Sequence, residues 1–163
     1  MDSVRRLRIL AVDDEDGELE RTMQAVRRLG LPYEARRAHD GFEALDYLYG
    51  RGRFHERSRH PLPHVVLLDF AMAPIDGLQV LRRIKDADYL KHIPVMLLCE
   101  SGHERERAIN EGVHMAASVA KPLDTEELRE LLAEFVPWTQ KISPGAHYPS
   151  PFQETGDRPR FSA

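Results

Sequence analysis

The residue of this chain best placed to do chemistry is Asp69. It follows residues 65–68, four consecutive apolar residues that are too few for a helix and that predict a short strand buried on both faces. Asp76 and Gly77 then turn the chain, and a helix is expected from Leu78. Ligands of open α/β sheets bind beyond the carboxyl ends of the strands, so an acid at this place is more often functional than one on a helix face. The alternative is an aspartate that only caps a turn.

Three more charged residues stand at the ends of predicted strands. Asp13 and Asp14 follow an apolar strand at residues 7–12, and Lys121 closes a short strand at residues 115–120. Taken separately, Asp13 and Asp14 could be an ordinary pair of surface acids, and Lys121 an ordinary loop lysine before a proline. All of them at carboxyl ends of strands in one sheet would be a rare coincidence.

Three carboxylates at one edge of a sheet repel each other unless a cation lies among them. Mg²⁺ prefers about six oxygen ligands, commonly one or two carboxylates, a carbonyl and waters. We therefore predict a magnesium site in which Asp14 and Asp69 bind the ion directly, Asp13 acts through water, and the backbone carbonyl of Ala71 contributes. No helical pair of histidines accompanies these acids, so zinc is not expected.

A lysine beside a metal-bound carboxylate indicates phosphoryl transfer. Lys121 could bind a phosphoryl oxygen and, with the ion, neutralise charge in the transition state. Asp69 would then be the nucleophile and would form an acyl phosphate. An aspartyl-phosphate phosphatase is a competing hypothesis, but that chemistry normally needs a second acid two residues after the nucleophile, where this chain has Ala71.

The elements that must position these residues alternate between strand and helix five times. Strands are expected at residues 7–12, 32–38, 65–68, 93–98 and 115–120, and helical apolar spacing or caps follow each of them. This alternation predicts a doubly wound α/β fold with a five-stranded parallel sheet and helices on both faces. In the flavodoxin-like order 2-1-3-4-5, the first and third strands are neighbours, which brings Asp13, Asp14 and Asp69 together.

The composition argues against several classes of protein. The chain has 163 residues with 23 basic and 27 acidic side chains, so no global basic excess indicates a nucleic-acid partner. The single cysteine, Cys99, excludes an internal disulfide framework. The apolar run near the N-terminus is too short for a signal sequence or a membrane span, so a cytoplasmic protein with no membrane partner is expected.

The last part of the chain differs from the rest. Residues 1–136 are expected to form one domain, and residues 137–163 a tail that holds 5 of the 11 prolines and should be extended rather than helical. Aromatic residues are unusual in a solvated linker, so we expect this tail to dock on its own domain or on a second copy. A disordered end is the alternative. The aromatic residues are Trp138, Tyr148, Phe152 and Phe161.

As a set, these residues resemble the receiver domains of two-component response regulators, over roughly residues 7–135. Asp13 and Asp14 match the acid pair, Asp69 the phosphoacceptor, and Lys121-Pro122 the lysine and its proline. The long loop at residues 50–63 and Trp138 are similar to single-domain regulators that work with bacterial phytochromes. The resemblance implies phosphorylation by a histidine kinase, with a bacteriophytochrome as the narrower candidate, and with Mg²⁺. It also implies signalling through protein contacts, including a homodimer to which the C-terminal tail contributes.

The chain departs from that family at the end of the fourth strand. Receivers usually place a threonine or serine there, whose hydroxyl binds the phosphoryl group, and here the residue is Cys99. A thiol is a weaker donor, and Ser101 could substitute if the strand extended by two residues. A strand-five aromatic is also missing, with Ser118 in its place. One alternative is therefore a constitutive interaction protein that keeps the fold without the switch, and another is a redox sensor at Cys99.

Overall fold

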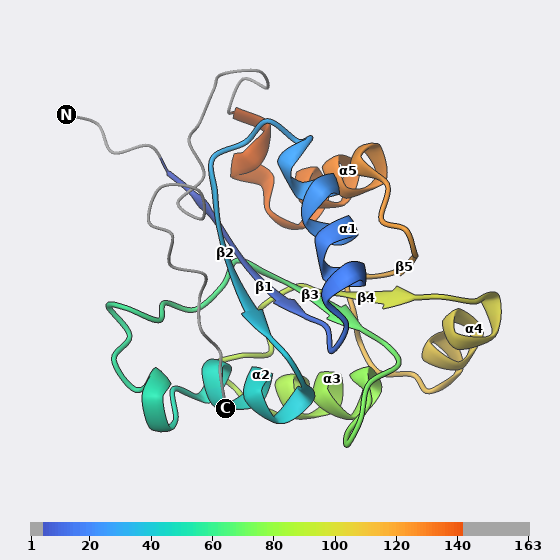
Figure 1. The fold of residues 1–163 in the computed structure, drawn as a ribbon, viewed down its shortest axis with the longest axis horizontal. Coiled ribbons are helices and arrows are strands. Elements are labelled where there is room, and N and C mark those ends of the chain that lie inside the picture. Colours follow the sequence, from blue (N-terminus) through green and yellow to red (C-terminus); the bar gives the residue numbers. More distant parts are fainter. Residues whose placement is uncertain (1–4, 142–163) are drawn as a thin grey trace.

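The computed structural model describes residues 5–141, which form a five-stranded parallel sheet between two layers of helices (Figure 1). The strand order is β2-β1-β3-β4-β5, which confirms the predicted doubly wound sheet. The strands are β1 Leu7–Val12, β2 Tyr33–Ala38, β3 Val65–Asp69, β4 Val95–Cys99 and β5 Ala117–Ala120. All of β3 and β4 is buried, because both faces of these strands are covered by helices.

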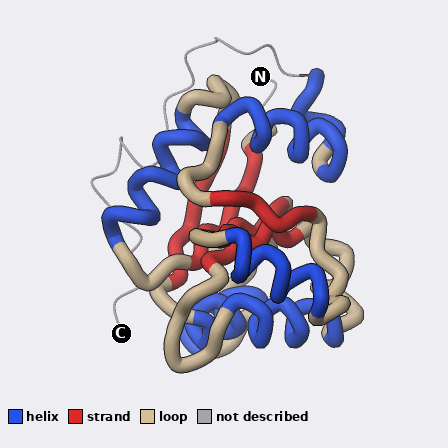
Figure 2. Tube along the Cα trace, turned by 90° about the vertical axis from the view of Figure 1, so that its right-hand side faces the viewer, coloured by secondary structure: helices blue, strands red, loops and turns tan. Residues whose placement is uncertain are grey.

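The two faces of the sheet carry separate apolar cores. Figure 2 shows helices on both sides of the strands. Side chains from α1 and α5 pack on one face, and side chains from α2 and α3, with Ala108 of α4, pack on the other. The helices are α1 Asp16–Arg27, α2 Gly41–Tyr49, α3 Gly77–Asp86, α4 Gly102–Asn110 and α5 Thr125–Phe135. In the part of the chain that the structure describes, no helix is long and apolar enough to cross a membrane.

Three helices begin at an aspartate that caps them. The side chains of Asp40, Asp76 and Asp124 each accept a hydrogen bond from the backbone N–H three residues later. At α3 the bond is reciprocal, because the Gln79 side chain accepts from the Asp76 N–H. In the sequence, Asp124 with Glu127 three residues later predicts a helix cap, and the structure confirms it.

The return of the chain after Asp69 depends on Gly77. The Gly77 N–H donates to the Phe70 carbonyl at 2.8 Å. A Cβ on Gly77 would lie 2.5 Å from the Asp69 carbonyl oxygen, far inside van der Waals contact. Only glycine therefore lets α3 start this close to the end of β3.

Two sequence expectations about packing were wrong. The helical spacing of Phe42 with Leu45 and Leu48 predicts that Phe42 faces the core, but Phe42 is 45% exposed and lies on the outer side of α2. The four arginines and one glutamate of the loop at residues 50–63 predict a solvated loop, yet it contains the 3₁₀ helix Gly52–Phe54 and buries Phe54. Arg57 holds this loop in place by donating to the Tyr47 and Leu48 carbonyls at the end of α2.

The beginning of the expected tail is packed on the domain. Residues Pro137–Lys141 form a 3₁₀ helix rather than the predicted extended segment. The Trp138 ring packs edge-on against His64 with centroids 5.2 Å apart, and the Arg5 guanidinium lies 4.1 Å from the Trp138 ring centre. Apolar and cation–π contacts make this docked turn more stable than an extended chain. Tyr148, Phe152 and Phe161 lie outside the described residues.

Candidate functional site

Asp13, Asp14 and Asp69 form an acid cluster at one edge of the sheet. One carboxylate oxygen from each lies within 4.8 Å of the others. The register explains this proximity, since Val12 of β1 pairs with Leu68 of β3 and the acids follow directly in both strands. Asp13 and Asp69 are buried, whereas Asp14 is exposed, so the cluster opens to solvent on the Asp14 side.

Lys121, which directly follows β5, reaches the same cluster at this edge of the sheet. Its Nζ lies 2.8 Å from Asp69 Oδ1 and 3.3 Å from Asp13 Oδ2, and its side chain is only 7% exposed. The backbone is fixed at this point because the Lys121 N–H donates to the Cys99 carbonyl at the end of β4. A buried ammonium group between two buried carboxylates is well compensated for the water it loses.

Burial dominates the electrostatics of the phosphoacceptor candidate. It raises the pKa of Asp69 from 3.8 to about 6, while the hydrogen bond and charge of Lys121 act in the lowering direction. Asp13 and Asp14 raise the pKa of Asp69 further by like-charge repulsion. For Lys121, burial lowers the pKa, but the hydrogen bond and charge of Asp69 outweigh it and the net direction is upward. At neutral pH the lysine is charged and most Asp69 side chains are ionised.

The donors of the cluster fit a hard divalent cation. Three carboxylates against one ammonium group leave an excess of negative charge, and carboxylate oxygens are the ligands that Mg²⁺ prefers. Asp13 Oδ1 already accepts the Glu15 N–H at 3.0 Å, which fixes the orientation of that carboxylate. Ala71 lies in the exposed loop after β3, and its carbonyl remains a predicted ligand.

Cys99 and Ser101, the two residues proposed to replace the usual hydroxyl, lie outside the acid cluster. Cys99 is the last residue of β4, 1% exposed, with its thiol packed in the core and 3.9 Å from the Leu97 carbonyl. Ser101 does not continue the strand, which ends at Cys99. Its hydroxyl instead caps α4 by accepting the Glu104 N–H. The premise that β4 extends to Ser101 was therefore wrong, because the α4 cap stabilises the turn at that point.

The placement of Cys99 also bears on the redox hypothesis. Burial raises the pKa of the Cys99 thiol to about 11, and the negative charge of Glu104 adds to this. Reactive cysteines are partly exposed thiolates, so the environment of Cys99 argues against a redox sensor.

One acidic residue near the site was missed from the sequence. Glu18 Oε2 lies 3.9 Å from Lys121 Nζ, and Glu18 also pairs with Arg21. Glu18 could have been found from the sequence, because it lies in the first turn of the helix that follows the Asp13–Asp14 pair. That turn must lie beside the carboxyl ends of the strands.

Family comparison explains this combination of residues. The response regulator receiver domain family matches residues 9–133, which include the acid pair, Asp69 and Lys121. The chain belongs to the response regulator receiver family. Receiver domains are signalling proteins of two-component systems rather than classical enzymes.

Individual relatives agree with this assignment. The receiver domain is 35% identical over 126 residues to the probable methanogenesis regulatory protein FilR2 of Methanothrix harundinacea, covering 77% of this chain and 79% of FilR2. Among solved structures it resembles the bacteriophytochrome response regulator AtBRR, with a TM-score of 0.73 and 35% identity over 81% of this chain and 94% of that one. The bacteriophytochrome response regulator RtBRR gives a TM-score of 0.72 and 32% identity, over 80% and 78% of the two chains.

Proposed function

We propose that this receiver domain accepts a phosphoryl group on Asp69 from a histidine kinase, and that the phosphorylated form signals through protein contacts. The observation that carries the proposal is the 2.8 Å contact between Lys121 and Asp69 inside the acid cluster. A carboxylate held beside a buried cation and two further acids fits a nucleophile for phosphorus better than it fits a helix cap or a surface ion pair.

The proposed reaction is a displacement at phosphorus. An oxygen of Asp69 attacks the phosphoryl group of a phosphohistidine, an O–P bond forms, and the N–P bond breaks. The electron pair of that bond returns to the imidazole nitrogen, which takes a proton from solvent. Lys121 remains charged throughout and donates to a phosphoryl oxygen, while burial of Asp13 and Asp69 keeps competing water away from the reacting atoms.

A divalent cation would be held by Asp13, Asp14, Asp69 and the Ala71 carbonyl. When bound, it supplies positive charge that neutralises the phosphoryl oxygens and the three carboxylates together. We infer that the natural ion is Mg²⁺, because this donor set is all oxygen and partly open to water.

The likeness to AtBRR and RtBRR supports a narrower partner. Both are described as bacteriophytochrome response regulators, and the likeness covers about four fifths of this chain. We therefore propose a phytochrome-type histidine kinase as the phosphate donor. We also propose a homodimer to which the tail, residues 137–163, contributes.

Intact-mass measurement tests the phosphoacceptor role. The purified chain is incubated with acetyl phosphate, with and without Mg²⁺, and should gain the mass of one phosphoryl group only when the ion is present. Asp69→Asn should gain nothing, whereas the matched control Asp88→Asn, an exposed acid paired with Lys91, should behave like the parent. An equal gain in Asp69→Asn would refute the assignment.

The constitutive alternative has one observation in its favour. The last residue of β4 has no hydroxyl, since Cys99 is a buried thiol, and Ser101 lies beyond the strand at the cap of α4. In that case phosphorylation would change neither the oligomeric state nor partner affinity. Sedimentation with and without the phosphodonor separates the two: a shift in sedimentation supports the switch, and identical profiles with unchanged binding support the alternative.

A further inference from the structure

The end of β4 lacks the donor that a phosphoryl group on Asp69 would need. A phosphoryl group carries three acceptor oxygens. In the proposed function the cation and Lys121 each bind one of them. The Cys99 thiol is buried in the core, and Ser101 lies two residues beyond the end of β4, where its side chain is held at the cap of α4, so we expect neither to serve the third oxygen.

Arg105 lies beside this place. It is the fourth residue of α4, and its Nε donates to Ser118 Oγ of β5 at 3.2 Å. Ser118 pairs with Leu97 and Ala120 with Cys99, so the Arg105 side chain lies over the same ends of β4 and β5 that frame the site. The charges of Arg105, Asp69 and Lys121 all act on the Cys99 thiol, so the arginine and the acid cluster both lie near the end of β4.

Breaking the hydrogen bond between Arg105 and Ser118 should cost little stability. It is exposed and joins a guanidinium to a neutral hydroxyl. A guanidinium bond to a phosphate oxygen is charge-assisted and roughly twice as strong as a neutral bond. A new dianionic group on Asp69 would therefore draw Arg105 away from Ser118.

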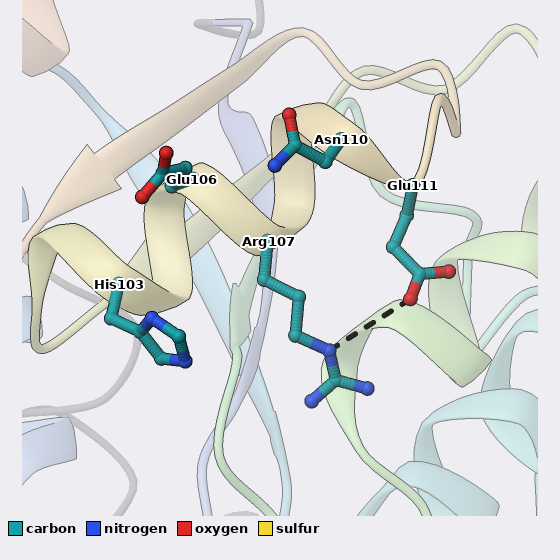
Figure 3. Close-up of a pocket in the computed structure, with 5 residues that line it drawn as sticks. All are labelled: His103, Glu106, Arg107, Asn110 and Glu111. Atoms are coloured by element: carbon teal, nitrogen blue, oxygen red, sulfur yellow. Dashed lines mark ion pairs between the residues drawn. The ribbon is translucent and has the colours of Figure 1, made fainter.

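The helix that carries Arg105 is loosely attached. Ala108 is the only residue of α4 that is buried. The side of α4 turned toward α3 is polar and lines a shallow pocket with His103, Glu106, Arg107, Asn110 and Glu111 (Figure 3). It is held to α3 by two ion pairs: Arg107 lies 3.7 Å from Asp76 at the cap of α3, and Glu111 pairs with Arg82 of α3. Such pairs are individually weak and screened by salt, so α4 can shift when Arg105 changes partner.

We propose that Arg105 binds the phosphoryl group on Asp69 and thereby takes over the readout that a strand-end hydroxyl and a strand-five aromatic would otherwise provide. The inference rests on the proposed function of Asp69. Phosphorylation moves the Arg105 guanidinium from Ser118 to a phosphoryl oxygen, and α4 follows.

Nuclear magnetic resonance of the full chain tests this, with beryllofluoride and Mg²⁺ as the phosphoryl mimic and acetyl phosphate as the donor. The Arg105 Nε–H resonance and the α4 amides should shift in the parent on addition of either. In Arg105→Gln the α4 shifts should be lost while the mass gain on Asp69 persists. Ser118→Ala, which frees Arg105, should move the unmodified spectrum part of the way toward the phosphorylated one.

Arg129→Gln is the matched control, because Arg129 lies on α5 and donates to the Leu29 carbonyl instead. It should keep the α4 shifts of the parent. Equal α4 shifts in Arg105→Gln and the parent, or an Arg105 Nε–H resonance that does not move, would overturn the inference while leaving Asp69 phosphorylation intact. Absence of a mass gain in the parent would instead refute the proposed function, and the Arg105 inference with it.

Discussion

Lys121 Nζ lies 2.8 Å from Asp69 Oδ1, although 52 positions separate the two residues in the chain. The contact exists because the carboxyl ends of β3 and β5 open onto the same edge of the sheet, with only β4 between them. The proposed function can therefore be tested by single substitutions, because the side chain of Lys121 or of Asp69 can be changed without altering the strands of the sheet.

Replacing Lys121 should slow phosphorylation strongly. Lys121→Met removes one charge-assisted bond, of about 1.5–3 kcal/mol, so the initial rate with acetyl phosphate should fall roughly ten- to hundredfold. Lys85→Met is the control, because Lys85 is also partly buried but donates to the Lys91 and Ile93 carbonyls away from the site. Intact-mass time courses give both rates. Equal rates for Lys121→Met and Lys85→Met would exclude a role for the Lys121 ammonium group.

Compared with the parent, Asp14→Asn should be more stable to heat without Mg²⁺ and should gain less stability when Mg²⁺ is added. Without the ion, the substitution removes like-charge repulsion within the acid cluster and should raise the melting temperature. With Mg²⁺ at about a hundredfold over its dissociation constant, the parent should gain about 2.7 kcal/mol of stability, and Asp14→Asn much less. Thermal unfolding across a Mg²⁺ titration measures both effects. A parent protein indifferent to Mg²⁺ would rule out the predicted ion site.

Asp69 should make the folded state less stable as pH rises. Its pKa is raised to about 6 from 3.8, so its favourable contribution is complete below about pH 3.8 and is lost as pH rises through 6. Asp69→Asn should therefore be more stable than the parent at pH 7, by up to about 3 kcal/mol, and the difference should vanish near pH 4. Urea unfolding without divalent ions at the two pH values checks this. A larger advantage at pH 4 than at pH 7 would show that the sign is wrong.

His64 should make the protein sensitive to acid. Its Nδ1 accepts the Arg8 N–H at 2.8 Å, which requires the neutral ring. Burial, with Arg8 and Arg5 nearby, lowers the pKa of His64 to about 4. This group therefore contributes stability above its ordinary pKa near 6.5, and that contribution is lost as pH falls from 6.5 toward 4.

His64→Asn isolates the titration of the ring. An asparagine side-chain oxygen can still accept the Arg8 N–H but cannot take up a proton in this range, so the stability of His64→Asn should depend less on pH between 6.5 and 4 than that of the parent. Unfolding followed by Trp138 fluorescence reports on the same corner of the molecule, because Trp138 packs on the His64 ring. Parallel pH profiles for the two proteins would contradict the proposed burial effect.

The strands and the meeting of the acids were predictable because each rests on a short-range pattern. The short apolar run at residues 65–68 predicted a buried strand, and alternation with helices leaves few sheet orders. The sequence could therefore place the three acids and the lysine at one edge in advance: Asp13, Asp14, Asp69 and Lys121. The negative charge of the three carboxylates then predicted a divalent cation as their ligand. None of this required knowledge of a side-chain contact.

The features that escaped prediction are contacts between side chains and distant backbone or polar groups. Arg57 binds carbonyls at the end of α2, and Arg105 binds Ser118 of β5, but an arginine in a polar segment looks the same in sequence whether it is solvated or anchored. Phe42 lies on the exposed side of α2 because Gly41 takes the inner position, where any Cβ would meet Ile75 and Val80 within 2.8 Å. Such steric competition is decided by elements far apart in the chain.

Trapping the acyl phosphate on Asp69 is the decisive measurement. The chain is incubated with acetyl phosphate and Mg²⁺ and then reduced with borohydride, which converts a phosphorylated aspartate into homoserine, and the peptide carrying residues 65–77 is sequenced by tandem mass spectrometry. Homoserine at position 69, and its absence after incubation without Mg²⁺, is the predicted result. Homoserine at position 13 or 14 instead, or no conversion in a sample whose intact mass shows the phosphoryl gain, would contradict Asp69 as the phosphoacceptor.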